Sequence, residues 1–579
     1  MAGTRSSGVT TAPDVDVPSR RYVSVQFAPS DIQQLKTHAA ELVARPLPDR
    51  AALERWVLDW SELESLVHAG FSRRRIAMTR NTADPEIREA YGWYSRTVVP
   101  EWERIRKDLA ERYLDCAFKA ALPARFELFQ RDLAVQVELF RDENVDLLAK
   151  DRELRARHAR MTGGQSVDLD GKPHTIQQAN ARLTLGDRRT RESTYRAVTG
   201  VLLGHAESLH GLLDEMLVTR GTIAANAGVA DYRAYAFLDR ARFDYGPADC
   251  LAFHDAVERV VVPVIRKRRE QRRQQLELAS LRPWDLRVDP HRPEPHRPFR
   301  DERGYIDIGR TLFAAVDRRF ADEFDILVRN NLLDLMSRPG KAPGGYNAEV
   351  RDIRLPFIFS NAVGNASEVR TLLHEGGHAF HTLATRHEPV PQLANAPIEF
   401  AEVASMSMEL FAMEHYGAAY SEDDARLNAI ALLERRLELF PWVATIDAFQ
   451  HWLYLHPGHT RKARTEQWLA IHERFNPGVD WSGLEDVRSH LWQNQQHIFR
   501  APFYYIEYAI AAIGALQVWS EFRRAPHDAI ESYRQALALG GTARLPDLFA
   551  AAGARFGMDE TLLERVVGSA TERLDALEA

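Results

Sequence analysis

Cysteine is scarce in this sequence. The chain has only two cysteines in 579 residues, Cys116 and Cys250. Two cysteines cannot form the dense disulfide network of a small secreted protein, and they argue against a metal site built from thiolates. We therefore expect a reducing, cytoplasmic setting.

Long apolar runs and an excess of positive charge are also missing. The longest apolar stretch, Pro502 to Trp519, carries Glu507 and Gln517, which favours a buried helix over a membrane span. The net charge is −7, so no overall positive field would attract nucleic acid. Residues 1–20 lack the apolar core of a secretory signal and are expected to form a disordered tail. We expect neither a membrane nor a nucleic-acid partner, and the oligomeric state stays open.

Helical periodicity dominates the rest of the sequence. Apolar residues recur every three or four positions, which predicts a mainly α-helical fold, and the length is sufficient for two lobes. A turn-rich stretch at 162–173 indicates a joint between them. We predict an N-terminal helical lobe at residues 21–190 and a second lobe at residues 191–579.

Three stretches add detail to that pattern. Between residues 339 and 365, glycines and short apolar runs indicate a small β-sheet with a strand at Leu355–Ser360. Such a strand could pair with an extended peptide, or it could belong to a purely structural sheet.

From Ala396 the sequence is helical again, with a break expected at Pro441. The basic run Arg266–Arg273 fits either an anionic partner or a solvated helix face, and an acidic protein favours the second.

The motif H-E-x-x-H is formed by His374, Glu375 and His378. On an α-helix, positions four apart share a face, so both imidazoles can reach one metal ion. Glu375 lies beside that face, where it suits a general base acting on a metal-bound water more than a ligand. Gly376 and Gly377 each cost roughly 1 kcal/mol of helix propensity. Close packing or close approach of a substrate would explain them.

A third ligand decides whether this motif is a site, because two histidines on a helix are by themselves more often a solvated face. The segment P-I-E-F-A-E-V-A-S-M-S-M-E-L-F places Glu399, Glu402 and Glu409 near one helical stripe, among apolar neighbours that favour burial. Buried carboxylates repel one another, and a nearby cation would relieve them. Two histidines and Glu402, with a fourth position open, make the ligand set of a catalytic zinc. His381 and Glu409 are candidates for orienting the ligands.

The motifs around this site resemble those of a known family. Besides H-E-G-G-H-A-F-H, they include G-G-Y-N-A-E, P-F-I-F-S-N, P-I-E-F-A-E-V-A-S, L-R-P-W-D-L and H-I-F-R-A-P-F-Y-Y-I-E-Y. The sequence is similar to the oligoendopeptidase F branch of the thimet oligopeptidase-like zinc metallopeptidases, with similar blocks from about residue 220 to about residue 556. The resemblance implies a mainly α, two-lobed, clam-like metallopeptidase with a small β-sheet near the zinc site. It makes residues 191–579 the zinc-peptidase catalytic lobe.

The resemblance also implies roles for individual residues. One zinc ion per chain would be held by His374, His378 and Glu402, the glutamate of A-E-V-A-S. In the family, a histidine and two tyrosines later in the chain stabilise the reacting carbonyl. His497, Tyr505 and Tyr508 match that pattern best.

The tyrosines leave alternatives open. Tyr505 and Tyr508 are three residues apart, so on a helix both hydroxyls can face one cavity, although a tyrosine-rich core helix would look the same. Tyr504 is adjacent and is a candidate for substrate binding. Tyr346 follows two glycines and could touch the substrate backbone.

These features together predict a zinc-dependent endopeptidase that hydrolyses short unfolded oligopeptides. Glu375 would accept a proton from the attacking water and pass it to the leaving amine. A peptidyl-dipeptidase of the same family, which is an exopeptidase, is one alternative. A helical binding protein with a non-catalytic metal site is another, and the intact Glu375 argues against it because a structural site needs no base.

Overall fold

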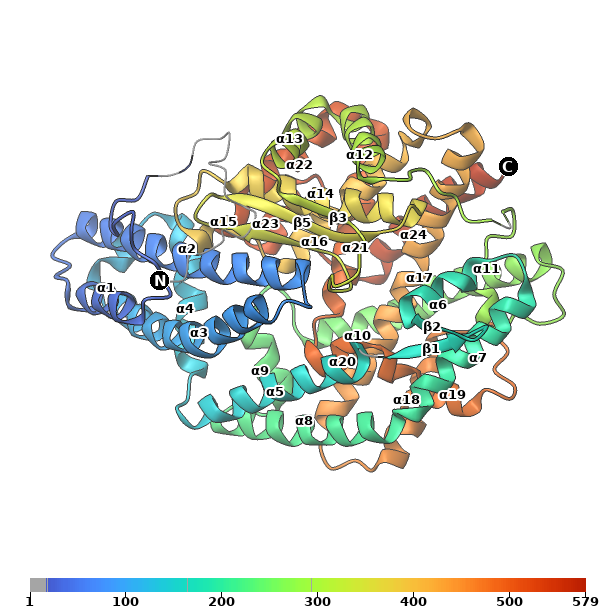
Figure 1. The fold of residues 1–579 in the computed structure, drawn as a ribbon, viewed down its shortest axis with the longest axis horizontal. Coiled ribbons are helices and arrows are strands. Elements are labelled where there is room, and N and C mark those ends of the chain that lie inside the picture. Colours follow the sequence, from blue (N-terminus) through green and yellow to red (C-terminus); the bar gives the residue numbers. More distant parts are fainter. Residues whose placement is uncertain (1–16, 18, 164, 293) are drawn as a thin grey trace. The chain divides into compact units, whose positions relative to one another are not determined.

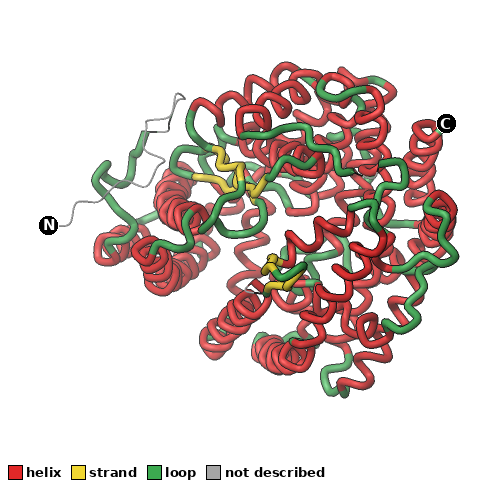
Figure 2. Tube along the Cα trace, turned by 45° about the vertical axis from the view of Figure 1, so that its right-hand side comes forward, coloured by secondary structure: helices red, strands yellow, loops and turns green. Residues whose placement is uncertain are grey.

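Helices make up most of the structure, as the periodicity predicted, and the strands of the described residues form two small sheets (Figures 1 and 2). The computed structural model describes residues 17, 19–163, 165–292 and 294–579. The tail expected at residues 1–20 lies mostly outside the described residues. In these described ranges, every helix is too short or too polar to cross a membrane.

The chain divides into two compact units, each made of three separate segments. The first comprises Met1–Val137, Arg297–Ala425 and Gly514–Phe556, and the second comprises Glu138–His296, Arg426–Ile513 and Gly557–Ala579. Three of the boundaries fall inside helices, namely α4 (Glu127–Leu139), α17 (Glu422–Leu455) and α21 (Ile506–Arg524). The predicted lobes at 21–190 and 191–579 were continuous in sequence, and their boundaries stay a prediction.

The first unit combines helices with a three-stranded sheet. Its other elements are α1 (Ile32–Ala44), α2 (Arg50–Arg80), α3 (Pro85–Leu114), α12 (Glu302–Val316), α13 (Arg318–Arg329), β3 (Leu333–Met336), β4 (Tyr346–Val350), β5 (Leu355–Ala362), α14 (Ala366–Thr385), α15 (Pro391–Ala394), α16 (Ile398–Met413), α22 (Pro526–Leu539) and α23 (Leu545–Ala551). The strand order is β3-β5-β4, with β3 parallel and β4 antiparallel to the central β5. The strand predicted at Leu355–Ser360 is confirmed as β5, which is buried along almost its whole length.

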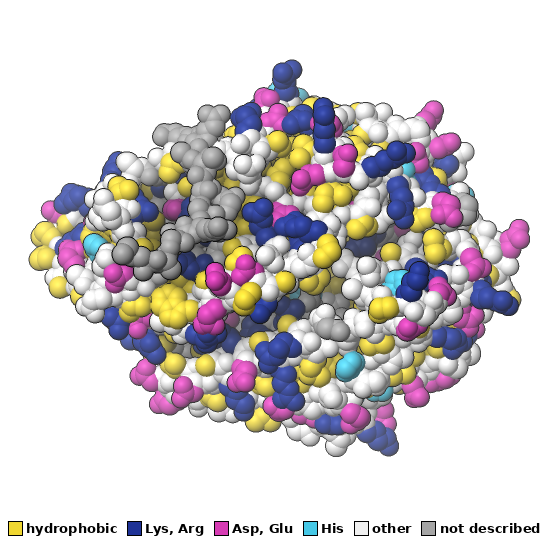
Figure 3. All heavy atoms as spheres, viewed as in Figure 1, with side chains coloured by type: hydrophobic (Ala, Val, Ile, Leu, Met, Phe, Trp, Pro, Cys, Tyr) yellow, Lys and Arg dark blue, Asp and Glu magenta, His cyan; other side chains and the backbone are white. Residues whose placement is uncertain are grey.

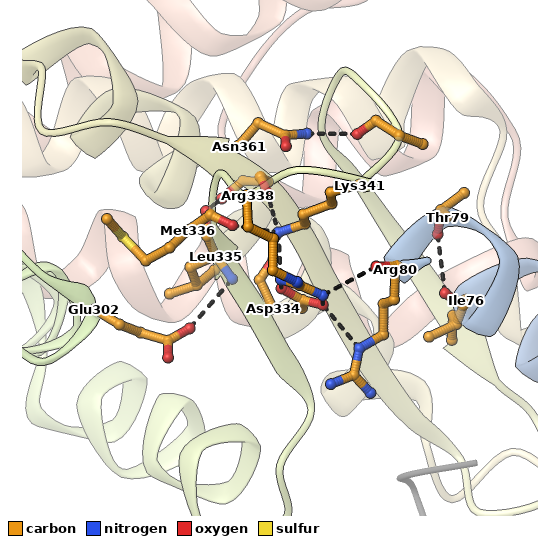
Figure 4. Close-up of polar contacts among 12 residues, drawn as sticks. Ile76, Thr79, Arg80, Glu302, Asp334, Leu335, Met336, Arg338, Lys341 and Asn361 are labelled. Carbon is orange, nitrogen blue, oxygen red and sulfur yellow. Dashed lines mark hydrogen bonds and ion pairs between the residues drawn. The ribbon is translucent and has the colours of Figure 1, made fainter. Parts of the chain in front are cut away.

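A buried ion cluster fixes the edge of this sheet (Figure 4). Asp334 on β3 accepts hydrogen bonds from Lys341 at 2.7 Å, from Arg338, and from Arg80 of α2 at 2.8 Å. Burial disfavours the charge on Asp334, but Arg338 and Lys341 outweigh it and lower the pKa of Asp334 to about 2. Asn361 on β5 donates to the carbonyl oxygens of residues 342 and 344, both at 2.8 Å. The glycine-rich loop that leads into β4 is therefore held on both sides.

Two glycines let α14 pack closely against its neighbours. A Cβ atom at Gly377 would lie 2.5 Å from Cα of Ser405 on α16, and one at Gly376 would lie 2.4 Å from Cζ of Phe313 on α12. Any larger residue at position 377 would separate α14 from the backbone of α16. Of the two explanations for the glycine pair, close helix packing is the one that the structure shows.

The second unit combines helices with one β-hairpin. Its other elements are α5 (Glu143–Gly163), β1 (Ser166–Leu169), β2 (Lys172–Thr175), α6 (Ile176–Ala181), α7 (Arg188–Gly204), α8 (Ala206–Asn226), α9 (Tyr232–Asp239), α10 (Pro247–Ala256), α11 (Val262–Gln275), α18 (Arg461–Phe475), α19 (Glu485–His490), α20 (Gln496–Arg500) and α24 (Glu560–Glu578). Most of the turn-rich stretch predicted at 162–173 belongs to the β1–β2 hairpin, which spans residues 166–175. Its two turn residues, Asp170 and Gly171, have φ values of 58° and 74°, as a tight two-residue hairpin turn requires.

The expected helix break at Pro441 is wrong. Helix α17 continues through Pro441, which is buried, and Thr445 donates its hydroxyl proton to the Pro441 carbonyl at 2.7 Å. A proline inside a helix removes one backbone hydrogen bond, and the packing of a long, largely buried helix offsets that loss.

The basic run on α11 is partly neutralised by acidic side chains of the same chain. Arg268 pairs with Asp575 and Glu578, and Arg272 pairs with Glu434. The arginines thus hold α11 against neighbouring helices in addition to facing solvent. On the face of the molecule shown in Figure 3, acidic and basic side chains are interspersed.

Candidate metal centre

Helix α14 presents the H-E-x-x-H motif. The helix begins after Asn365, and the Glu368 carboxylate accepts hydrogen bonds from the backbone N–H groups of Val363, Gly364 and Asn365, each at 2.8 Å. These hydrogen bonds satisfy backbone N–H groups just ahead of the helix. The negative charge of Glu368 is also stabilised there, because it lies at the positive end of the helix dipole. The start of α14, and with it the direction of its histidine face, is fixed by the sequence around Glu368.

The structure brings His374, His378 and Glu402 together. One ligand atom from each residue lies within 4.8 Å of the other two, a spacing that could hold a metal ion. Oε2 of Glu402 is 3.5 Å from Nε2 of His374 and 3.8 Å from Nε2 of His378. The carboxylate is buried, whereas both imidazoles keep about a fifth of their surface open to solvent. This arrangement leaves one side of the cluster accessible.

Two further contacts orient these side chains. Nδ1 of His374 donates a hydrogen bond to Oε1 of Glu409 at 2.7 Å, which turns Nε2 toward Glu402. The hydroxyl of Ser405 shares its proton between the backbone carbonyl oxygen of Glu402 at 3.0 Å and Oε2 of Glu402 at 3.3 Å. Glu409 therefore occupies the orienting position predicted for it. Among the described residues, Nε2 of His381 has no hydrogen-bond partner, so that nitrogen does not orient a ligand.

The cluster concentrates negative charge. Burial disfavours a charge on His374, but its hydrogen bond to Glu409 and the charges of Glu409, Glu402 and Glu375 outweigh that effect and raise the pKa of His374 to about 9. Burial lowers the pKa of His378 to about 3, so this imidazole is neutral and can offer a lone pair. A divalent cation would neutralise the excess carboxylate charge.

Glu375 lies between the cluster and the sheet. Burial, reinforced by Glu402 and Glu409 against the opposing effect of His374, raises the pKa of Glu375 to about 7. A Cβ atom at Gly345 would lie 3.9 Å from Oε1 of Glu375, so the backbone just ahead of β4 runs beside this carboxylate. A carboxylate with a pKa near neutrality can both accept and release a proton at physiological pH.

The hydroxyl of Tyr346, on the edge strand β4, already has a partner in the protein. It lies 2.6 Å from Oγ1 of Thr79 on α2, and the ring stacks on Phe359 at a centroid distance of 4.9 Å. The guanidinium of Arg75 covers the same ring at 4.5 Å. Contact between Tyr346 and a substrate stays a prediction.

The second unit gathers the predicted histidine and tyrosines around one point. The ring of His497 lies 4.9 Å from that of Tyr505, 5.9 Å from that of Tyr508 and 5.7 Å from that of Tyr504. Tyr505 lies one residue before α21, which begins at Ile506, and its ring is nevertheless 5.3 Å from that of Tyr508. Phe503, with φ of 61°, is in the left-handed region and turns the chain just before the helix. Burial raises the pKa of Tyr505 to about 12, so its hydroxyl keeps its proton and can donate it.

Comparison with known proteins places this geometry in a family. Residues 183–567 match the profile of peptidase family M3. The chain belongs to peptidase family M3. The matched residues include the histidines of α14, Glu402 on α16 and the tyrosine cluster.

Individual relatives agree with this assignment to family M3. The chain is 26% identical to oligopeptidase PepF of Bacillus subtilis over 43% of its own length and 38% of the relative's. It is 24% identical to an oligoendopeptidase F homolog of Borreliella burgdorferi over 38% of its length and 39% of the relative's. The matched stretches thus span less than half of these relatives. The predicted resemblance to oligoendopeptidase F is confirmed.

A solved structure shows how much of the chain shares a known fold. The structure of PZ peptidase A superposes on this chain with a TM-score of 0.89, covering 96% of this chain and 99% of that one at 24% identity. The likeness includes the N-terminal helices, which lie before the residues matched by the family profile. The mainly helical fold predicted from the sequence is confirmed.

Proposed function

We propose that this member of family M3 is a zinc-dependent endopeptidase that hydrolyses short unfolded oligopeptides. The observation that carries the proposal is the convergence of two imidazoles and one carboxylate, with Glu375 one residue from the first histidine. A purely structural metal site has no use for such a carboxylate.

The residues fit a zinc ion. His374, His378 and Glu402 offer two nitrogens and one oxygen, which are donors that zinc prefers, and three protein ligands leave one coordination position for a reactant. A zinc ion in this position would polarise the scissile carbonyl and make water a better nucleophile. Glu409 would keep the His374 imidazole in the tautomer whose Nε2 lone pair faces the ion.

Glu375 is the proposed general base. It would accept a proton from the attacking water and then give that proton to the leaving amine nitrogen. Burial raises the pKa of Glu375 above its usual value, which favours a carboxylate that takes up the proton of the attacking water.

We assign stabilisation of the developing oxyanion to His497, Tyr505 and Tyr508. Their rings contact one another, and donors aimed at the reacting oxygen lower the barrier most when they are held in place beforehand. Tyr504 and Tyr346 are proposed to bind substrate. Since β4 is an edge strand, an extended peptide could also pair with it.

The names of the relatives, oligopeptidase and oligoendopeptidase, support short peptides as substrates. The low cysteine content supports a cytoplasmic location. A peptidyl-dipeptidase activity would use the same residues, and the two are separated by their products. Mass spectrometry of a digested peptide library would show internal cuts for an endopeptidase and only released C-terminal dipeptides for the alternative.

Three variants test the chemistry. Glu375→Gln is expected to retain zinc and lose nearly all turnover, because the ligands remain and the base is gone. Glu402→Gln should lose the catalytic zinc, whereas Glu399→Gln, a buried glutamate on the same helix, is the matched control and should keep it. Zinc loss from Glu399→Gln alone, or turnover by Glu375→Gln within about tenfold of the wild type, would overturn these assignments.

A further inference from the structure

Two helices of the second unit face each other with pairs of metal-binding side chains. Helix α10 carries Cys250 and His254, and helix α17 carries Asp447 and His451, each pair four residues apart on one helical face. One ligand atom each from Cys250, Asp447 and His451 lies within 4.8 Å of the other two. None of these residues takes part in the peptidase mechanism proposed above.

The cluster is cut off from solvent. Cys250 and Asp447 have no exposed surface, and the two histidines are 2% exposed. Oδ2 of Asp447 accepts a hydrogen bond from Nε2 of His254 at 2.9 Å and lies 3.3 Å from Nε2 of His451. Among the described residues, Oδ1 of Asp447 has no hydrogen-bond partner, and the contact of Nε2 of His451 is the 3.3 Å approach to Oδ2 of Asp447. A buried oxygen without a partner costs stability, and an ion bound to it would remove that cost.

We propose that Cys250, Asp447 and His451 form a second metal site, which takes a zinc-type divalent cation and joins α10 to α17. Thiolate, imidazole and carboxylate are the donors that zinc prefers in proteins. On binding, the thiol of Cys250 gives its proton to the buffer and its sulfur forms a bond to the metal. Thiolate and carboxylate together balance the two charges of the ion, so the buried site is neutral.

His254 completes the surroundings of the ion. Its hydrogen bond to Oδ2 holds the Asp447 carboxylate in place, as expected of a side chain that orients a ligand. The site has no solvent-exposed side, so a substrate cannot reach the ion, and its role is structural. The sequence argued against a thiolate-built site because cysteines are few, but this arrangement needs only one.

The side chain of Arg233 is expected to weaken metal binding by His451. Its Nη1 lies 3.4 Å from Nδ1 of His451, at the limit of a hydrogen bond. When Nε2 of His451 binds a metal, Nδ1 carries the proton, so two donors would meet and the half-buried guanidinium must turn aside. A glutamine at position 233 could accept that proton through its side-chain oxygen. Arg233→Gln is therefore expected to tighten metal binding by roughly tenfold.

Cobalt substitution distinguishes this site from the one on α14. The full-length chain is stripped with a chelator and titrated with Co²⁺, while the near-ultraviolet thiolate-to-cobalt charge-transfer band and the number of bound ions are recorded. The ligands on α14 and α16 include no sulfur, so only the Cys250 site can give that band. We expect two ions per chain and a band that saturates with one of them. A wild-type chain without the band overturns the proposal, whatever the variants show.

Variants assign the band to the residues. Cys250→Ser is expected to abolish the band and lower the ion count by one, whereas Cys116→Ser, at the other buried cysteine, should leave both unchanged. Glu402→Gln should lose one ion and keep the band, so failure of the peptidase site and failure of this site give different results. A band that survives in Cys250→Ser, or one that is lost in Cys116→Ser, contradicts the assignment.

Discussion

Nδ1 of His374 donates a hydrogen bond to Oε1 of Glu409 at 2.7 Å, across the packed helices α14 and α16. The contact ties the first histidine of the motif to a carboxylate far along the chain. Glu409→Gln is expected to weaken zinc binding by roughly 10- to 100-fold, because the amide is a poorer acceptor and no longer fixes the imidazole. Competition with a zinc chelator would measure the loss. Wild-type affinity in this variant would show that helix packing alone orients His374.

The two glycines of α14 should respond differently to the same substitution. Gly377→Ala places a methyl group against the backbone of Ser405, whereas Gly376→Ala meets the ring of Phe313. A backbone cannot yield without moving a helix, so Gly377→Ala is expected to destabilise the protein by about 3 kcal/mol and Gly376→Ala by about 1 kcal/mol. Urea unfolding would measure both changes. Equal losses would mean that α14 and α16 adjust as freely as a side chain.

Oxyanion stabilisation can be separated from binding by kinetics. Tyr508→Phe and His497→Ala are each expected to reduce kcat by a factor of about 10²–10³ with little change in KM or zinc content, because a lost oxyanion donor raises mainly the transition-state energy. Tyr504→Phe should have a smaller effect and serves as the control. A fluorogenic peptide provides the assay. Normal turnover by both Tyr508→Phe and His497→Ala would remove the cluster from the mechanism.

The stability of the second unit should fall in mild acid. Burial, with the charge of Arg500, lowers the pKa of His158 to about 4, whereas an unfolded chain binds the proton near pH 6.5. Between these values the unfolded state holds more protons, so unfolding becomes easier by up to about 1.4 kcal/mol per pH unit as the pH falls. His158 stacks on Phe499 at 4.3 Å, so His158→Phe keeps an aromatic contact and should flatten this slope. His527→Phe, at an exposed site, is the control, and an unchanged slope in His158→Phe would refute the argument.

Local patterns were enough to predict much of the fold and the grouping of His374, His378 and Glu402. The pattern of residues within one short segment was sufficient for three features: the H-E-x-x-H motif, the glutamate stripe of α16 and the strand β5. The first two have a spacing of about four residues, as in a helix, and the third is a short apolar run, as in a buried strand. The start of α21 could not be read in this way, because the positive φ of Phe503 is imposed by surrounding structure and leaves Tyr505 outside the helix. The predicted helix break at Pro441 was wrong for the same reason, because packing around α17 outweighs the local preference of proline to end a helix.

The division of the chain into two discontinuous units could not be predicted from local sequence patterns either. Nothing in the local sequence indicates that Arg80 on α2 will meet Asp334 on β3, because that ion pair depends on how distant segments fold together. The cluster of Cys250 with Asp447 is another example, since each half is an unremarkable pair on its own helix.

The ion pair between Arg80 and Asp334 bears on how this protein can be shortened. A fragment trimmed to the residues that match the family profile, 183–567, would discard α2 and so take Arg80 from Asp334 and Thr79 from Tyr346. The strands beside Glu375 would then lose their outer support, although every proposed zinc ligand would still be present. Deletion of α2 should thus yield an insoluble polypeptide and not a minimal peptidase, and directed-evolution libraries for this enzyme should keep the residues of α2.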